Sequence, residues 1–157
     1  MKARRDDSLP FVESIIRACE SCNLAMVDES GQPYVVPMNF GYNEGILYFH
    51  GDPKGRKNEL LTKNPKVAIS FSTDHQLYHQ NEEVACSYSM AYRSVLAYGE
   101  VEFIDDYDQK VEALNIIMNQ YAEGSFRYSK PAVLNVKVFK VAVSTFHGKE
   151  FGKLRKT

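Results

Sequence analysis

The chain has 157 residues, a length that suits a single domain, residues 1–157, with a buried core. No apolar run approaches the roughly 20 residues that a membrane-spanning helix needs, and the charged segment 1–10 lacks the apolar stretch of a secretory signal. The net charge of −1 offers no field that would recruit nucleic acid or an anionic membrane. We therefore expect a cytoplasmic protein that binds neither nucleic acid nor membrane.

The first half of the chain predicts a helix followed by a meander of strands. Ser8 can cap a helix with Pro10 in its first turn, and apolar residues then recur at helical spacing as far as Cys19. Good turn sequences at 29–32 and 43–45 separate the β-rich runs that follow. These runs are 23–28, 34–42 and 46–50. Consecutive strands joined by short turns form an antiparallel meander.

The second half adds two helices and three further strands. The expected helices are 56–63, which Asn64-Pro65 ends, and the amphipathic 107–121. The expected strands are 67–72, 92–104 with a bend at Gly99, and 133–143, whereas the polar segment 73–85 receives no assignment. Six or seven strands and three helices without βαβ alternation indicate an α+β, mainly β fold with a barrel or rolled sheet.

The cysteines and paired histidines offer little chemistry. Three cysteines are an odd number, which argues against a secreted disulfide framework. Cys19 and Cys22 have C-x-x-C spacing, but they lie at the expected end of a helix, where the dipole disfavours a thiolate. We expect structural thiols. His75 and His79 are four residues apart in a segment without helical periodicity, so we predict no metal site there.

A loop at 51–55 leads into a helix that opens with two cations. Free backbone N–H groups at a helix start, beside Arg56 and Lys57, form an anion site. The glycine spacing is not that of a Walker loop, and no G-x-G-x-x-G follows a strand, so the pattern favours a mononucleotide over a dinucleotide. An ordinary solvated helix start is the alternative interpretation.

Two further features lie beside this loop. Pro37 removes a ladder donor from a strand, which predicts an edge, a bulge or a mouth where Pro37, Met38 and Asn39 meet a flat polar heterocycle, or else a simple edge strand. His50 ends the third strand directly before the loop. Its imidazole can donate or accept a proton near neutrality, although a lone histidine often has only a structural hydrogen bond.

Taken in order, these segments resemble a known family. The motifs are VPMNFG at 36–41, YFH at 48–50, GRK at 55–57, YRSV at 92–95 with Gly99, and HGK at 147–149. Together they resemble the pyridoxamine 5′-phosphate oxidase-like FMN-binding split-barrel proteins, and within them the nitroimidazole-resistance (Nim) subfamily. The resemblance covers the chain from residue 1 to about residue 150.

The resemblance implies a homodimer of six-stranded antiparallel split β-barrels with flanking helices, and one FMN in each of two clefts between protomers. Arg56 and Lys57 would hold the FMN phosphate, and His50 would be the catalytic candidate, positioning cofactor or acceptor rather than donating a proton. Asp52 places a carboxylate near the phosphate and must point away from it. The cofactor-binding residues that the motifs imply are Val36, Pro37, Met38, Asn39, His50, Gly51, Arg56, Lys57, Arg93, Ser94 and Lys149.

The function that follows is an FMN-dependent oxidoreductase. It would reduce a small-molecule acceptor, such as a nitroimidazole-type nitro compound, with electrons from NAD(P)H or a redox partner. Vitamin B6 oxidation is disfavoured because the chain lacks the R-x-x-P-type substrate motif at its end. Two alternatives stay open: a flavin-binding module without turnover, and a haem-binding split-barrel protein with His50 or His147 as the axial ligand.

Overall fold

The computed structural model describes residues 2–152, in which all strand pairs are antiparallel and belong to one eight-stranded sheet. The strands are β1 (Ala3–Arg5), β2 (Cys22–Val27), β3 (Pro33–Met38), β4 (Gly41–Asn43), β5 (Ile46–Gly51), β6 (Lys66–Tyr78), β7 (Ser89–Ile104) and β8 (Lys137–Phe151). The helices are α1 (Leu9–Ala18), α2 (Arg56–Lys63), α3 (Tyr107–Tyr121) and α4 (Lys130–Asn135), with a 3₁₀ turn, η1, at Ala85–Ser87. The strand order is β3-β2-β6-β7-β8-β5-β4, and β1 pairs with β8.

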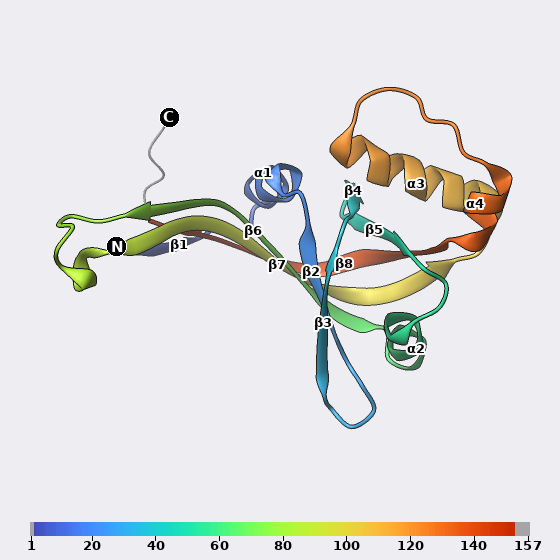
Figure 1. Ribbon diagram of the computed structural model, residues 1–157, viewed down its shortest axis with the longest axis horizontal. Helices are drawn as coiled ribbons and strands as arrows, with labels where there is room; N and C mark the ends of the chain where they lie inside the picture. The colour runs from blue at the N-terminus through green and yellow to red at the C-terminus, as the bar shows by residue number, and fades with distance from the viewer. Residues whose placement is uncertain (1, 153–157) are drawn as a thin grey trace.

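The sheet rolls around an aromatic and aliphatic core (Figure 1). Alternate residues of β2 are buried, as the two-residue period of a strand requires. Phe40 meets Phe71 edge to face at 5.0 Å between ring centroids, and Phe49 stacks on Phe139 at 5.1 Å. Helix α1 contributes Val12, Ile15 and Ile16, all fully buried, to the same core.

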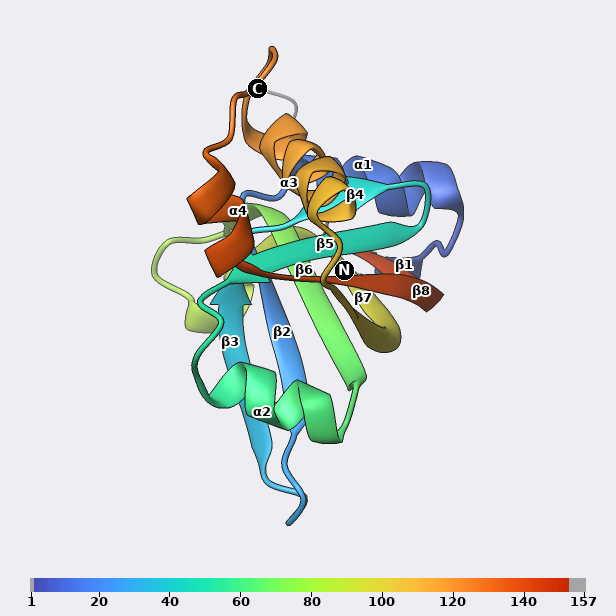
Figure 2. The ribbon, with the colours of Figure 1, turned by 90° about the vertical axis from the view of Figure 1, so that its right-hand side faces the viewer.

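Helices α3 and α4 lie together on one side of the sheet (Figure 2). Gly41 of β4 permits this approach, because a Cβ there would lie 2.6 Å from the Ile117 nitrogen of α3. Lys110 of α3 is 7% exposed, and its ammonium donates to the carbonyls of Val133, Leu134 and Val136 at 3.3, 3.5 and 2.9 Å. These carbonyls lie at the end of α4, where a helix lacks its own donors. A single buried cation thus fastens α4 to α3.

A long arm projects from the opposite side of the molecule (Figure 1). We use "arm" for residues 73–92, the far ends of β6 and β7 with their connection, together with β1. The β6–β7 register shifts between Thr73 and Gln76, where Asp74 has a φ of +57°. Both strands continue beyond this bulge because each supplies the other's ladder.

The fold class is confirmed, with three differences in detail. The sheet has eight strands in residues 2–152 instead of six, since β1 is added and the expected strand 34–42 divides into β3 and β4. The unassigned segment 73–85 partly continues β6. The predicted strand 133–143 is wrong at its start: Ser129 caps α4, Pro131 lies in its first turn, and β8 begins only at Lys137.

Two local predictions are confirmed. Pro37 lies in β3, the terminal strand of the sheet order, where a missing ladder donor is tolerated. The β7–β8 register shifts between Tyr98 and Gly99, at the expected bend. Within residues 2–152, no helix is long and apolar enough to cross a membrane.

Candidate functional site

The start of α2 meets the ends of β3 and β5 at a place that we call the α2 corner. Its residues are Met38, His50, Gly51, Arg56, Lys57 and Asn58. Gly55 is the N-cap residue, with a φ of +129° that favours glycine, and no side chain caps the helix. The first-turn N–H groups of α2 are therefore available to an anion, and the helix dipole favours negative charge there.

Lys57 brings a half-buried positive charge to the corner. Its Nζ lies 3.3 Å from the Met38 sulfur, and a Cβ at Gly51 would lie 2.9 Å from the same nitrogen. Burial lowers the pKa of Lys57, and the Asp52 carboxylate partly offsets this effect without forming an ion pair in the described residues. A buried ammonium without a carboxylate partner is stabilised by an anion such as phosphate.

Arg56 and Asp52 are two other charged residues near this cation in the chain. The Arg56 guanidinium is exposed, pairs with Asp28 at 3.5 Å and stands over the Tyr34 ring at 5.4 Å. Asp52 accepts a hydrogen bond from the Lys54 N–H at 2.7 Å. One oxygen of the Asp52 carboxylate is thus engaged within its own loop, while the charge of that carboxylate still acts on Lys57.

Asn58 is a corner residue that the sequence reasoning missed. Its amide nitrogen donates to the Asp52 carbonyl at 2.7 Å, which fastens the 51–55 loop to α2. Its Oδ1 is buried and has no hydrogen-bond partner in the described residues. A buried acceptor without a donor is rare in folded proteins, so Asn58 is an unsatisfied polar group beside the start of α2. The sequence gives no signal for it beyond its place two residues after Arg56.

His50 lies at the end of β5, opposite Val138 of β8. His50 is an exposed residue, and partial loss of hydration, followed by the positive charge of Lys57, lowers its pKa below the usual 6.5. The imidazole is therefore neutral at pH 7 and can both donate and accept a hydrogen bond. His50 also lines an apolar cavity formed by α3 and α4.

Met38 is the β3 residue that contacts Lys57 at the corner. Met38 is buried and its carbonyl accepts a 3.6 Å contact from the Cys22 thiol. Val36 packs partly against the core, whereas Pro37 is exposed on the edge strand. Asn39 donates to the Glu20 carbonyl at 3.3 Å. β3 is the terminal strand of the sheet order, so in the described residues its outer edge has no strand partner.

The remaining predicted residues lie elsewhere. Ser94 and Lys149 are cross-strand partners and line, with Arg5 and His147, a separate cavity of about 580 Å³. Lys149 lies eleven residues beyond Val138, the partner of His50, along β8. That path is on the order of 35 Å at the usual rise of a strand.

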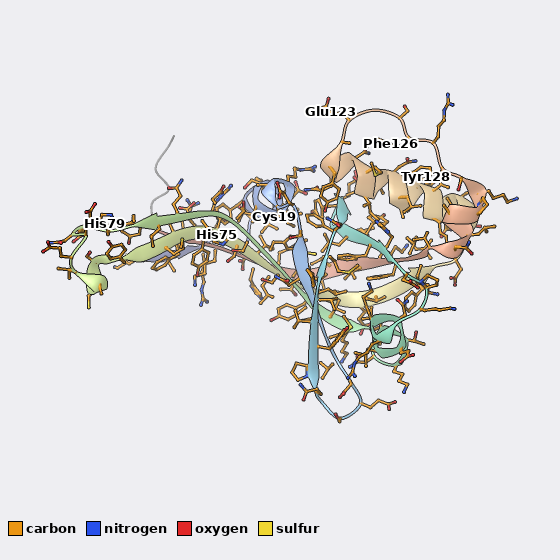
Figure 3. All side chains as sticks on the ribbon, in the orientation of Figure 1. Cys19, His75, His79, Glu123, Phe126 and Tyr128 are labelled. Atoms are coloured by element: carbon orange, nitrogen blue, oxygen red, sulfur yellow. The ribbon has the colours of Figure 1, made fainter. Side chains whose placement is uncertain are left out.

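Arg93 lies next to the arm on β7 and contacts both the arm and helix α1. Its guanidinium forms an ion pair with Asp74 and donates to the Ser14 hydroxyl at 3.1 Å. The arm histidines also have local partners: His75 lies 2.6 Å from the Ser72 hydroxyl, and His79 stacks on Tyr88 (Figure 3). Arg93 therefore has a structural role that the motif did not suggest.

The C-x-x-C pair is buried. Burial raises the pKa of Cys19, and it raises that of Cys22 to about 12. Thiols of this kind are not thiolates at neutral pH and pack as small apolar groups. No group of three or more metal-ligating side chains occurs in residues 2–152.

Comparison with known proteins identifies the family. The family model described as pyridoxamine 5′-phosphate oxidase matches residues 11–150. The chain belongs to the pyridoxamine 5′-phosphate oxidase family. Its α2 corner, with Gly55, Arg56 and Lys57, lies within the matched region. No curated protein matches the sequence.

Solved structures agree with this family and with the Nim resemblance. A candidate 5-nitroimidazole antibiotic resistance protein from Bacteroides thetaiotaomicron is 46% identical, with a TM-score of 0.86 over 96% of this chain and 89% of that one. The flavocytochrome Anf3 from Azotobacter vinelandii and an FAD- and haem-binding protein from Mycobacterium smegmatis are 19% and 18% identical. Their TM-scores are 0.82 and 0.83, over 98% of this chain and 72% and 76% of theirs, and this likeness shows the shared fold.

Proposed function

We propose that this protein binds FMN and acts as an oxidoreductase that reduces a small acceptor, with nitro compounds of the nitroimidazole type as candidates. The observation that carries the proposal is Lys57, a half-buried cation without a carboxylate partner beside the uncapped start of α2. Family membership and the 46% identical relative support the same conclusion.

The residues of the α2 corner fit the parts of FMN in turn. Lys57, Arg56 and the α2 N–H groups would hold the phosphate. The edge segment 36–39 would lie along the isoalloxazine ring, with His50 and Gly51 beside it. When bound, FMN supplies two-electron transfer from NAD(P)H to the acceptor. The protein binds and orients both molecules, with neutral His50 as a hydrogen-bonding group.

A homodimer is part of this proposal. Ser94 and Lys149 lie at the far end of β8 from His50, along a path longer than a mononucleotide. In the proposed dimer, Ser94 and Lys149 of one protomer complete the FMN site at the α2 corner of the other. Sedimentation should show a dimer, and a monomer that holds FMN tightly would contradict this architecture.

The free cysteines bear on the cellular compartment that we propose for the protein. Cys19, Cys22 and Cys86 are all free, as expected where glutathione and thioredoxin keep cysteines reduced. This supports a cytoplasmic location, which fractionation of the source cells would check.

The absorption spectrum of the purified protein tests the cofactor first. A flavin spectrum with steady NAD(P)H consumption in the presence of a nitro acceptor supports the enzyme. A flavin spectrum without turnover would leave only a flavin-binding module. A haem spectrum without flavin would contradict the proposal.

A further inference from the structure

An apolar cavity adjoins the α2 corner on its α3–α4 side. Its volume is about 280 Å³, close to the lower end of the roughly 300–1,000 Å³ that small-molecule sites span. Figure 3 shows Tyr128 on the segment that links α3 to α4, above the β5 side of the sheet. The lining residues are His50, Leu114, Ile117, Met118, Tyr128, Ala132, Val133 and Val136.

The lining carries no formal charge at neutral pH. His50 is neutral for the reasons given above, and the Tyr128 hydroxyl already donates to Asn115 Oδ1 at 2.9 Å. The other lining groups are aliphatic, apart from the soft thioether of Met118. No cation lines the cavity, so an anion that entered would lose hydration without forming a direct ion pair, and the cavity disfavours anionic ligands.

Two contacts fix the cavity walls before any ligand arrives. The close approach of Gly41 to the Ile117 backbone sets the height of α3 over β4. Lys110 fastens the end of α4, and thereby Val133 and Val136, to α3 through its three carbonyl contacts. A wall held in this way needs little reorganisation on binding.

We propose that this cavity binds the apolar body of a small, uncharged molecule, with one polar group of that molecule directed at His50. The proposal rests on the proposed function, for which it supplies the acceptor class: neutral and compact rather than phosphorylated. The volume argues for this occupant over a second copy of the chain, because a docked helix or strand needs an extended groove with several anchor positions.

The experiment compares an uncharged probe with its anionic counterpart. Nitrobenzene and 4-nitrobenzoate are titrated calorimetrically into the protein in the presence of excess FMN, and the FMN spectrum is recorded in each sample. Ala132→Phe fills the cavity from an exposed position on α4, and Ala132→Leu fills it in part. Leu134→Phe is the matched control, since Leu134 is on the same helix, 56% exposed and outside the lining.

We expect nitrobenzene to bind at least tenfold more tightly than 4-nitrobenzoate. Ala132→Phe should weaken nitrobenzene binding at least tenfold, Ala132→Leu should weaken it less, and Leu134→Phe should leave it unchanged. Equal binding of the two probes would overturn the cavity assignment. Nitrobenzene binding that neither Ala132 variant alters would also overturn it, even if the protein reduces an acceptor with FMN bound. Loss of dimers in Ala132→Phe, without nitrobenzene binding to the wild type, would overturn it in favour of a second copy.

The FMN spectra separate this inference from the proposed function. Nitrobenzene binding that depends on Ala132 in samples where FMN does not bind would retain the cavity as a neutral-ligand site and reject the flavin proposal.

Discussion

The α2 corner and the arm with its neighbouring strands both carry basic residues, but these residues differ in whether protein groups satisfy them. In the arm and the strands beside it, two of the basic residues have protein partners: Arg93 is held by Asp74 and Ser14, and His147 lies 3.3 Å from Asp7, which also accepts from a backbone N–H. At the corner, the helix start is uncapped, Lys57 contacts a thioether, and a buried amide oxygen has no partner.

This difference separates structural polar groups from groups that await a ligand. A cation whose partners are all protein groups contributes to folding, and its removal leaves those partners unsatisfied. A cation without a partner contributes little to folding, and its desolvation is offset only when an anion arrives. Motif matching treats Arg93 and Lys57 alike, whereas their surroundings assign them different roles.

The largest expected effect is at the corner. Charge-assisted hydrogen bonds to a phosphate are worth about 1.5–3 kcal/mol each. Arg56→Ala combined with Lys57→Ala should weaken FMN binding at least about tenfold while the far-ultraviolet circular dichroism stays the same. Lys54→Ala with Lys63→Ala removes two nearby cations and serves as the control. Unchanged FMN affinity in the first variant would remove the phosphate assignment.

Substitution of Arg93, next to the arm, should lower the stability of the protein and leave FMN binding nearly unchanged. Arg93→Met leaves the Asp74 carboxylate and the Ser14 hydroxyl without their partner, and we expect a loss of about 1–3 kcal/mol in the free energy of unfolding. FMN affinity should change less than about twofold. Urea unfolding and an FMN titration of the same preparation check both values. A variant of normal stability with tenfold weaker FMN binding would reverse the comparison.

His50 should have a smaller effect on turnover. If the imidazole only positions cofactor or acceptor, His50→Gln keeps a hydrogen-bonding side chain and should lose less than about tenfold in kcat with the acceptor. Proton donation by His50 would instead predict a loss of roughly 10²-fold with normal FMN binding. Steady-state kinetics over a pH series distinguish these results, since only proton donation removes a pH-dependent limb from the profile.

The smallest expected effect is the pH dependence of stability. Because the folded-state pKa of His50 is below its usual 6.5, the unfolded chain binds this proton more readily. Its contribution to stability is complete above about pH 6.5 and falls as the pH drops through 6.5 toward the folded-state pKa. Between pH 7.5 and pH 5.5, the urea midpoint of the wild type should therefore decline more than that of His50→Gln. Equal declines would show that the His50 pKa is not lowered.

The features of the fold that could be predicted are those that depend on the local sequence pattern. Periodicity located α1, α2 and α3, and Pro37 indicated the edge strand because one missing donor has the same consequence in any sheet. The alternation of Leu134, Val136 and Val138 suggested a strand where α4 ends and β8 begins. Ser129 with Pro131 was the signal that could have corrected this error.

Features set by distant contacts could not be predicted. The outer half of β6 exists because β7 pairs with it across a bulge at Asp74, and its own polar sequence has no strand period. The role of Arg93 depends on Ser14, 79 residues away, and the unpartnered state of Asn58 Oδ1 depends on everything that surrounds it. Five motifs identified the family, but none specified which polar groups the fold would leave unsatisfied.

The central claim is that the α2 corner binds the phosphate of FMN, and a comparison of FMN with riboflavin tests it most directly. The dissociation constants of both ligands are measured for the wild type and for Arg56→Ala with Lys57→Ala. The wild type should prefer FMN at least about tenfold, and the variant should bind the two ligands within about threefold of each other. A variant that keeps the wild-type preference for FMN would contradict the account, because the phosphate would then be bound elsewhere.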